Sequence, residues 1–169
     1  MKDMSYTYLV SRNIERCKGC RICELVCSFV HVGEFNPTRS RIRVIRTEDE
    51  GIPYVAPVLC QQCEAPVCMD VCPVGAIYRD SETGAKLVDG DKCLGCRSCE
   101  FVCPFGGICV DHVAKVASKC DLCQGDPMCV QFCPFEALEY VRSDKLDIKR
   151  KRKGIRAVLE FEKEGVGRQ

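Results

Sequence analysis

Cysteine spacing constrains this chain more than any other feature of its sequence. Sixteen of the seventeen cysteines fall into four compact groups of four. Motif one is Cys17, Cys20, Cys23 and Cys27, and motif three repeats its spacing as Cys93, Cys96, Cys99 and Cys103. Motif two, with two extra residues inside, is Cys60, Cys63, Cys68 and Cys72. Motif four, with three extra residues, is Cys120, Cys123, Cys129 and Cys133. The chain must therefore fold around whatever these thiols bind.

A proline follows the last cysteine of motifs two, three and four, whereas Ser28 follows that of motif one. The pattern C-x2-C-x2-C-x3-C-P is the ligand pattern of bacterial-type ferredoxins, whose thiolates hold [4Fe–4S] clusters. In that pattern the fourth cysteine binds the neighbouring cluster, so the motifs act in pairs. The sequence therefore predicts four [4Fe–4S] clusters with all sixteen grouped cysteines as ligands.

Two other uses of clustered cysteines are structural zinc and disulfide bonding. Structural zinc also takes four thiolates, but zinc ribbons bring together two separated C-x2-C pairs. A disulfide framework suits short secreted chains, and no apolar signal segment opens this sequence. Iron–sulfur ligation is favoured over both. Cys109 stands outside the motifs and is expected to be a core residue of a strand.

Composition and charge agree with a fold dominated by clusters. The 169 residues include no tryptophan and few aromatics, which predicts a thin organic core. The formal net charge is +1, and four oxidised clusters, each 2− with its thiolates, would bring it to about −7. Basic residues within or beside the motifs could offset part of that charge or be solvated: Lys18, Arg21, Lys92, Arg97 and Lys119.

Short strands are expected between the motifs, each unit reading as a cluster loop, a short helix and a strand. The opening strand is placed at Tyr6–Arg12, and the insertion 28–59 holds strands at Arg41–Arg46 and Ile52–Leu59. Further strand segments are VGAIY and AKLVD after motif two, FGGICVD and KVASK after motif three, and FEALEYV after motif four. The fold class is α+β, with two ferredoxin-like lobes of two clusters each.

The last segment, residues 142–169, differs in composition from the rest. It contains five consecutive basic residues, Lys149–Lys153, followed by an acidic stretch. Without interleaved aromatics, and in a nearly neutral chain, this run favours a solvated face or a protein contact over nucleic-acid binding. No apolar run is long enough to span a membrane, and reduced cysteines favour the cytoplasm.

The four-motif plan resembles the four-cluster electron-transfer subunits of molybdenum and tungsten oxidoreductases, which include those of dimethyl sulfoxide reductase, formate dehydrogenase and nitrate reductase. More narrowly, CSFVHVGEFNPTRSRIRV, CPVGAI, TGAKLVD, CPFGGI and KCDLCQGDP resemble the small iron–sulfur subunit of the tungsten aldehyde ferredoxin oxidoreductase family, which includes class II benzoyl-CoA reductase. The resemblance covers residues 6–141.

The resemblance implies a pairing of motif one with motif four and of motif two with motif three, within one polyferredoxin domain over residues 1–141. The implied ligand sets are Cys17, Cys20, Cys23 with Cys133, and Cys120, Cys123, Cys129 with Cys27. The other pair is Cys60, Cys63, Cys68 with Cys103, and Cys93, Cys96, Cys99 with Cys72. Two lobes of two clusters would then form a wire along which electrons pass.

The chain shows no catalytic site of its own. It has no dinucleotide fingerprint and no nucleophile–base pair, and its two histidines, His31 and His112, are expected to be surface or loop-bracing residues. The expected partner is a large tungsten- or molybdenum-pterin catalytic subunit, with a further redox subunit or a ferredoxin at the other end. The alternatives are an electron-transfer subunit of a formate dehydrogenase, dimethyl sulfoxide reductase or hydrogenase-type complex, and a free soluble polyferredoxin.

Overall fold

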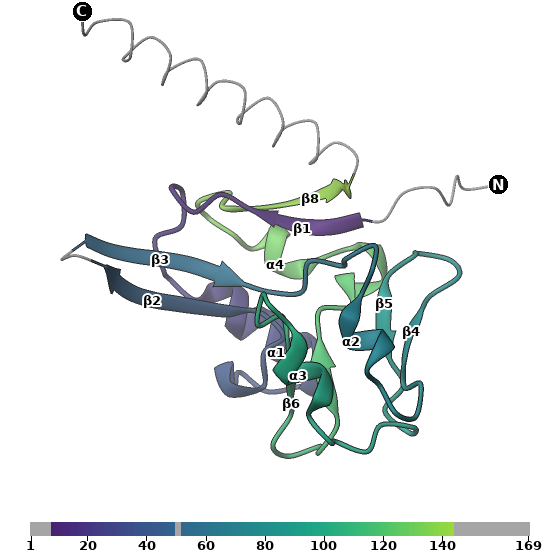
Figure 1. The fold of residues 1–169 in the computed structure, drawn as a ribbon. Coiled ribbons are helices and arrows are strands. Elements are labelled where there is room, and N and C mark those ends of the chain that lie inside the picture. The colour runs from purple at the N-terminus through teal and green to yellow at the C-terminus, as the bar shows by residue number, and fades with distance from the viewer. Residues whose placement is uncertain (1–7, 50–51, 144–169) are drawn as a thin grey trace, which may run out of the picture.

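A computed structural model describes residues 8–49 and 52–143, and they form short antiparallel strand pairs joined by short helices (Figure 1). The strand pairs are β1 (Tyr8–Arg12) with β8 (Leu138–Arg142), β2 (Arg43–Asp49) with β3 (Ile52–Val58), β4 (Ile77–Arg79) with β5 (Lys86–Val88), and β6 (Ile108–Val110) with β7 (Ala117–Lys119). The helices are α1 (Ile22–Val32), α2 (Val67–Asp70), α3 (Ser98–Val102) and α4 (Met128–Gln131), with 3-10 segments η1 (Pro37–Arg39) and η2 (Leu122–Gly125). The α+β class is confirmed. Among these described residues, no helix is long and apolar enough to cross a membrane.

The first and last described strands lie side by side. In β1 and β8, Val10 faces Tyr140 across the antiparallel ladder and is fully buried. The rings of Tyr8 and Tyr140 stack with their centroids 5.0 Å apart. The predicted strand Tyr6–Arg12 therefore exists from Tyr8 onward, and its first two residues lie outside the described part of the chain, as does the basic run Lys149–Lys153. This pairing joins the segment before motif one to the segment after motif four.

The insertion forms a hairpin, β2–β3, that projects from the rest of the molecule (Figure 1). The predicted strand Arg41–Arg46 begins two residues later, at Arg43, and continues to Asp49. Val44 in β2 and Ile42 just before the strand are buried, while Ile45 is 49% exposed on the other face. The Val44 N–H donates to Oε1 of the fully buried Glu24 over 2.6 Å, which ties the hairpin to α1.

Helix length depends on the residue after each motif's last cysteine. Helices α2, α3 and α4 have four or five residues and end before the cysteine that precedes a proline. A proline disfavours helical geometry in the residue before it, so these helices must stop there. Ser28 imposes no such limit, and α1 runs for eleven residues through Cys27. The Ser28 hydroxyl donates to the Leu25 carbonyl over 2.9 Å and accepts the Asn36 N–H over 3.0 Å.

Elements far apart in the sequence pack together according to motif. Helix α1 of motif one contacts α4 of motif four, and α2 contacts α3, while β5 contacts β7. Two hydrophobic clusters lie beneath them, one including Val10, Ile42 and Leu59 and the other including Ile77 and Ile108. Cysteines contribute to both clusters, which agrees with the thin organic core expected from composition.

Candidate metal centres

Three cavities each have four motif cysteines in their walls. One is lined by Cys17, Cys20, Cys23 and Cys133. Another is lined by Cys27, Cys120, Cys123 and Cys129. The third is lined by Cys72, Cys93, Cys96 and Cys99. In each, three cysteines come from one motif and the fourth is the last cysteine of another.

The remaining four cysteines act on one another electrostatically. Burial raises the pKa of the Cys63 thiol, and the charges of Cys60 and Cys103 raise it further. Burial likewise raises the pKa of Cys68, with Cys60, Cys103 and Cys63 adding to the effect. Cys60, Cys63, Cys68 and Cys103 therefore form a fourth neighbourhood of thiols, again three from one motif and one from another.

Burial makes several of these thiols hard to ionise by themselves. Burial raises the pKa of Cys23 to about 12, with the neighbouring Glu24 and Cys20 charges in the same direction. Burial also raises the pKa of Cys99 to about 11, and Cys93 repels its charge. Thiolates are nevertheless the form that binds metal, and a bound cation reverses this balance. An all-thiolate donor set of this kind suits soft iron–sulfur or zinc centres.

Backbone N–H groups point at the last cysteine of three motifs in the same way. The N–H donors are Ala76 to Cys72 Sγ at 3.2 Å, Gly107 to Cys103 Sγ at 3.4 Å, and Ala137 to Cys133 Sγ at 3.3 Å. Each donor lies four residues after its cysteine, on the turn that the proline begins. Hydrogen bonds to cluster sulfurs are one means by which a protein tunes an iron–sulfur centre. The same four-residue offset in three motifs means that the sequence repeat is also a structural repeat.

Glycine permits close backbone approach in two loops. Gly95 lies between Cys93 and Cys96 with φ +64°, and a Cβ placed there would lie 2.3 Å from the Lys115 carbonyl oxygen. A Cβ on Gly107 would lie 2.6 Å from the Cα of Cys60, so the chain leaving motif three passes directly over the start of motif two. A side chain at either glycine would push the two backbone segments in contact there apart.

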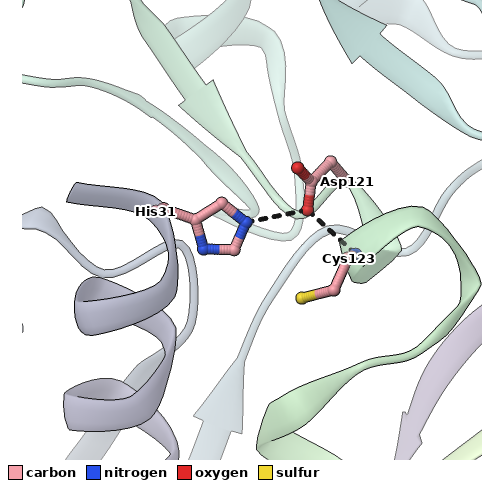
Figure 2. A group of neighbouring side chains, drawn as sticks. All are labelled: His31, Asp121 and Cys123. Carbon is pink, nitrogen blue, oxygen red and sulfur yellow. Dashed lines mark hydrogen bonds and ion pairs between the residues drawn. The ribbon is translucent and has the colours of Figure 1, made fainter. Parts of the chain in front are cut away.

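His31 lies beside Cys27 of motif one and reaches the loop of motif four, where Figure 2 shows it with Asp121 and Cys123. Because α1 continues past Cys27, His31 lies one helical turn further along and its ring lies against Cys27. Its Nδ1 atom is 2.7 Å from the Cys27 carbonyl oxygen and 3.7 Å from Cys27 Sγ. Its Nε2 lies 3.0 Å from Oδ1 of Asp121, which also accepts the Cys123 N–H at 3.0 Å. Burial opposes the His31 charge, but the hydrogen bonds to Asp121, Cys123 and Cys27 raise its pKa well above the usual value.

The sequence prediction for His31 was therefore incomplete, although its bracing part is correct. The ring links α1 to the loop of motif four across 90 positions of sequence. Burial opposes ionisation of Cys27, yet hydrogen bonds from His31, the Arg41 N–H and Ser40 lower its pKa. A histidine four residues after a motif cysteine that lacks a following proline was the available signal.

Cys109 lies apart from the four groups. It is part-buried in β6, where burial raises its pKa and the charges that act on it are those of Arg43, Glu100 and Asp111. Of the basic residues singled out near the motifs, Lys18, Arg21, Lys92 and Arg97 are exposed, and Lys119 is buried.

Comparison with known proteins places these features in a family. The family described as "4Fe-4S dicluster domain" matches residues 52–143, and a second family of the same description matches residues 16–77. The electron transfer subunit PhsB of thiosulfate reductase from Salmonella typhi is 34% identical over 161 residues, covering 89% of this chain and 83% of that subunit.

A second relative is the polyferredoxin-like subunit of aliphatic sulfonate oxidoreductase from Pyrococcus furiosus. It is 38% identical over 120 residues, which are 70% of this chain and 67% of that subunit. Among solved structures, the active site complex BamBC of benzoyl coenzyme A reductase aligns over 92% of this chain and 98% of its own, at 24% identity and a TM-score of 0.44, which is too low to establish a shared fold. The chain belongs to the 4Fe-4S dicluster family, as an iron–sulfur electron-transfer subunit of an oxidoreductase complex.

Proposed function

We propose that this chain holds four [4Fe–4S] clusters and relays electrons to or from a tungsten- or molybdenum-pterin catalytic subunit. The observation that carries the proposal is the sorting of all sixteen motif cysteines into four groups of four across motif boundaries. When bound, a [4Fe–4S] cluster accepts and donates electrons at a potential that its protein surroundings set. The chain's own part is to hold the clusters, space them and tune them.

The ligand sets follow the four groups. Motif one shares its two clusters with motif four, through the sets Cys17, Cys20, Cys23, Cys133 and Cys27, Cys120, Cys123, Cys129. Motifs two and three share the sets Cys60, Cys63, Cys68, Cys103 and Cys72, Cys93, Cys96, Cys99. The contacts of α1 with α4, of α2 with α3 and of β1 with β8 support two lobes built in this way over residues 1–141.

The order of the groups along the molecule supports a linear relay. Besides burial, the charge of Cys23 in the neighbouring group of its own lobe raises the pKa of Cys129. Cys120 is repelled by Cys60, which belongs to the other lobe, and Cys99 by Cys68. Among the motif cysteines only Cys20 and Cys96 are exposed, and they belong to the two groups at opposite ends of this series. Electrons would therefore enter and leave beside these two residues.

The narrower proposal is a partner of the tungsten aldehyde oxidoreductase and benzoyl-CoA reductase family, acting in the cytoplasm of an anaerobe. The loop sequences quoted above carry this proposal. The similarity to the thiosulfate reductase subunit favours the alternative, a complex of the dimethyl sulfoxide reductase and formate dehydrogenase kind.

Anaerobic purification from the native host, with tungsten and molybdenum measured in whatever accompanies the chain, tests the partner. Tungsten in a co-purifying large subunit, whose substrate reduces the chain's clusters, is the expected result. Molybdenum there would establish the alternative. A chain that purifies alone with its clusters would be a free polyferredoxin, and the proposal of a catalytic partner would fail.

A further inference from the structure

The residue two positions after the first cysteine has the same left-handed backbone conformation in all four motifs. These residues are Gly19, Gln62, Gly95 and Leu122, and their φ angles are +67°, +50°, +64° and +63°. Glycine adopts this conformation readily, whereas a residue with a Cβ atom is strained in it. Motifs one and three have glycine there, but motifs two and four carry a side chain. Strain of this kind persists where the surrounding contacts enforce it, and it often marks a functional position.

The two side chains in this strained position are held in different ways. Leu122 is 1% exposed and packs in the hydrophobic cluster that includes Val10, Ile42 and Leu59. Gln62 is also buried, at 2% exposure. Burying an amide is unfavourable unless its hydrogen bonds are made, so the presence of a glutamine must be explained by its partners.

Gln62 forms hydrogen bonds through both its side chain and its backbone. Its side-chain oxygen accepts the Lys86 backbone N–H over 2.7 Å, and its side-chain amide donates to the Cys120 carbonyl oxygen over 2.7 Å. Its backbone N–H donates to Cys60 Sγ over 3.4 Å, and its backbone carbonyl accepts from the Lys86 ammonium over 3.2 Å. One buried residue thus connects a thiol of motif two with the first cysteine of motif four.

This connection crosses the junction between the two halves of the proposed relay. Cys60 belongs to the group of thiols drawn from motifs two and three, and Cys120 belongs to a group drawn from motifs one and four. Both groups are the inner ones of the series. The side chain of Gln62 therefore holds the two inner groups against each other at a point shielded from solvent.

We propose that Gln62 is a positioning residue that fixes the separation of the two inner clusters, one bound through Cys60 and the other through Cys120. The inference rests on the proposed function. Electron transfer between two metal centres slows steeply as they move apart, so a small shift between the halves lowers the rate of passage. A buried polar network with its hydrogen bonds made holds such a geometry rigidly. Gln62 thus sets the rate at which electrons cross from one half of the relay to the other.

Glycine is the informative replacement for Gln62. Gln62→Gly gives motif two the residue that motifs one and three have in the same left-handed position. The loop should therefore keep its conformation and its cluster, and the backbone N–H that reaches Cys60 Sγ remains. What the variant loses is the side-chain contact with the other half of the molecule.

Gln61 provides a matched control in the same loop. Its side-chain amide donates to the Leu59 carbonyl oxygen over 2.9 Å, a contact only two residues away in the sequence. Gln61→Gly and Gln62→Gly therefore remove the same side chain from neighbouring positions. One variant loses a local contact and the other loses the contact between the two halves.

The experiment compares the full chain with its clusters in the wild type, Gln62→Gly and Gln61→Gly. Iron content and midpoint potentials are measured first. Each protein is then mixed rapidly with one reducing equivalent and frozen at successive times, and electron paramagnetic resonance follows the electron to the cluster of highest potential. The expected result is unchanged iron and midpoints in all three proteins, with passage several-fold slower in Gln62→Gly alone.

Three results would overturn the proposal. Equal rates in the three proteins would show that the Gln62 side chain does not control passage. Equal slowing in Gln61→Gly would show that any change in this loop has the same effect. A shifted midpoint of an inner cluster in Gln62→Gly would mean that Gln62 tunes a potential and does not set a separation.

Gln62→Asn keeps the inference testable if the glycine variant loses a cluster. Asparagine tolerates the left-handed conformation and keeps an amide, but its side chain is one methylene shorter and should lose the contact with Cys120. With its iron in place, this variant should show the slow passage expected of Gln62→Gly. Full iron with wild-type passage, or loss of iron in both variants, would overturn the proposal. The iron content of the wild type tests the four-cluster function separately, before any variant is compared.

Discussion

The Nε atom of Arg39 donates to Oδ2 of Asp111 over 2.9 Å, linking the insertion after motif one to the turn between β6 and β7. Both side chains are nearly buried, at 13% and 7% exposure, and Asp111 also accepts the N–H groups of Val113 and Ala114, each at 2.8 Å. Burial opposes the Asp111 charge, but these donors and Arg39 lower its pKa to about 2.

Arg39→Gln should destabilise the folded chain by about 3 kcal/mol, because it leaves the Asp111 carboxylate buried without its cation. The measurement is the rate at which the visible absorbance of the clusters bleaches in guanidinium under anaerobic conditions, since cluster loss makes unfolding irreversible. Arg16→Gln is the control, because Arg16 pairs with Glu136 at the surface, with side chains 52% and 75% exposed. Equal bleaching rates in the two variants would contradict a buried, structural role for the Arg39–Asp111 pair.

Gly95→Ala should damage the loop of motif three. The added Cβ would lie 2.3 Å from the Lys115 carbonyl oxygen at a backbone φ of +64°, so strain of at least about 1 kcal/mol is expected together with displacement of Cys96. The iron content per chain should fall toward the value expected for three clusters. Gly90→Ala is the comparison, because a Cβ there meets nothing within 4 Å; iron loss in both variants, or in neither, would refute the explanation.

Ser28→Pro should be harmful even though it restores the proline found in the other three motifs. Ser28 lies inside α1, where a proline removes a helix hydrogen bond and clashes with the preceding turn, at a cost of about 3 kcal/mol. Breaking α1 would also move His31 away from Cys27. The cluster bound by Cys27 should then be disturbed, and electron paramagnetic resonance would report the change. Ser28→Ala, which loses only the hydroxyl contacts to Leu25 and Asn36, should cost about 1 kcal/mol. A Ser28→Pro chain as stable as Ser28→Ala would show that the long helix is not needed.

Cys109→Ser should leave all four clusters in place, because the charges that act on Cys109 come from Arg43, Glu100 and Asp111. Cys96→Ser should lower the iron content or change the spectrum of one cluster, since Cys96 lines a cavity with Cys72, Cys93 and Cys99. Iron and sulfide analysis of the two purified variants distinguishes them. Loss of iron in Cys109→Ser would make Cys109 a ligand and contradict the assignment of the sixteen others.

Much of the fold could be predicted because cysteine and proline constrain the backbone locally. The prolines at 73, 104 and 134 end their helices, and the strand segments after each motif appear close to their expected places, as at Ile77–Arg79 and Leu138–Arg142. The family resemblance supplied the pairing of motifs. Spacing alone leaves open which motif shares a cluster with which, because that choice depends on contacts such as β1 with β8.

The residues around the cysteines were harder to predict, since their neighbours are distant in sequence. His31 contacts Asp121 across 90 positions, and Gln62 reaches the Cys120 carbonyl across 58. Lys119 could be named from its place beside Cys120, but its burial follows from the contact of β7 with β5. Local sequence patterns identify candidate ligands; tertiary packing decides which charges and donors reach them.

The central claim is that sixteen cysteines hold four [4Fe–4S] clusters in one relay. The most direct test is to measure iron, acid-labile sulfide and zinc per chain in anaerobically purified protein, then to reduce it stepwise while recording electron paramagnetic resonance. The expected result is about sixteen iron and about sixteen sulfide per chain, without zinc, and signals of clusters that interact magnetically with their neighbours. About eight iron per chain, or zinc in place of iron, would contradict the claim.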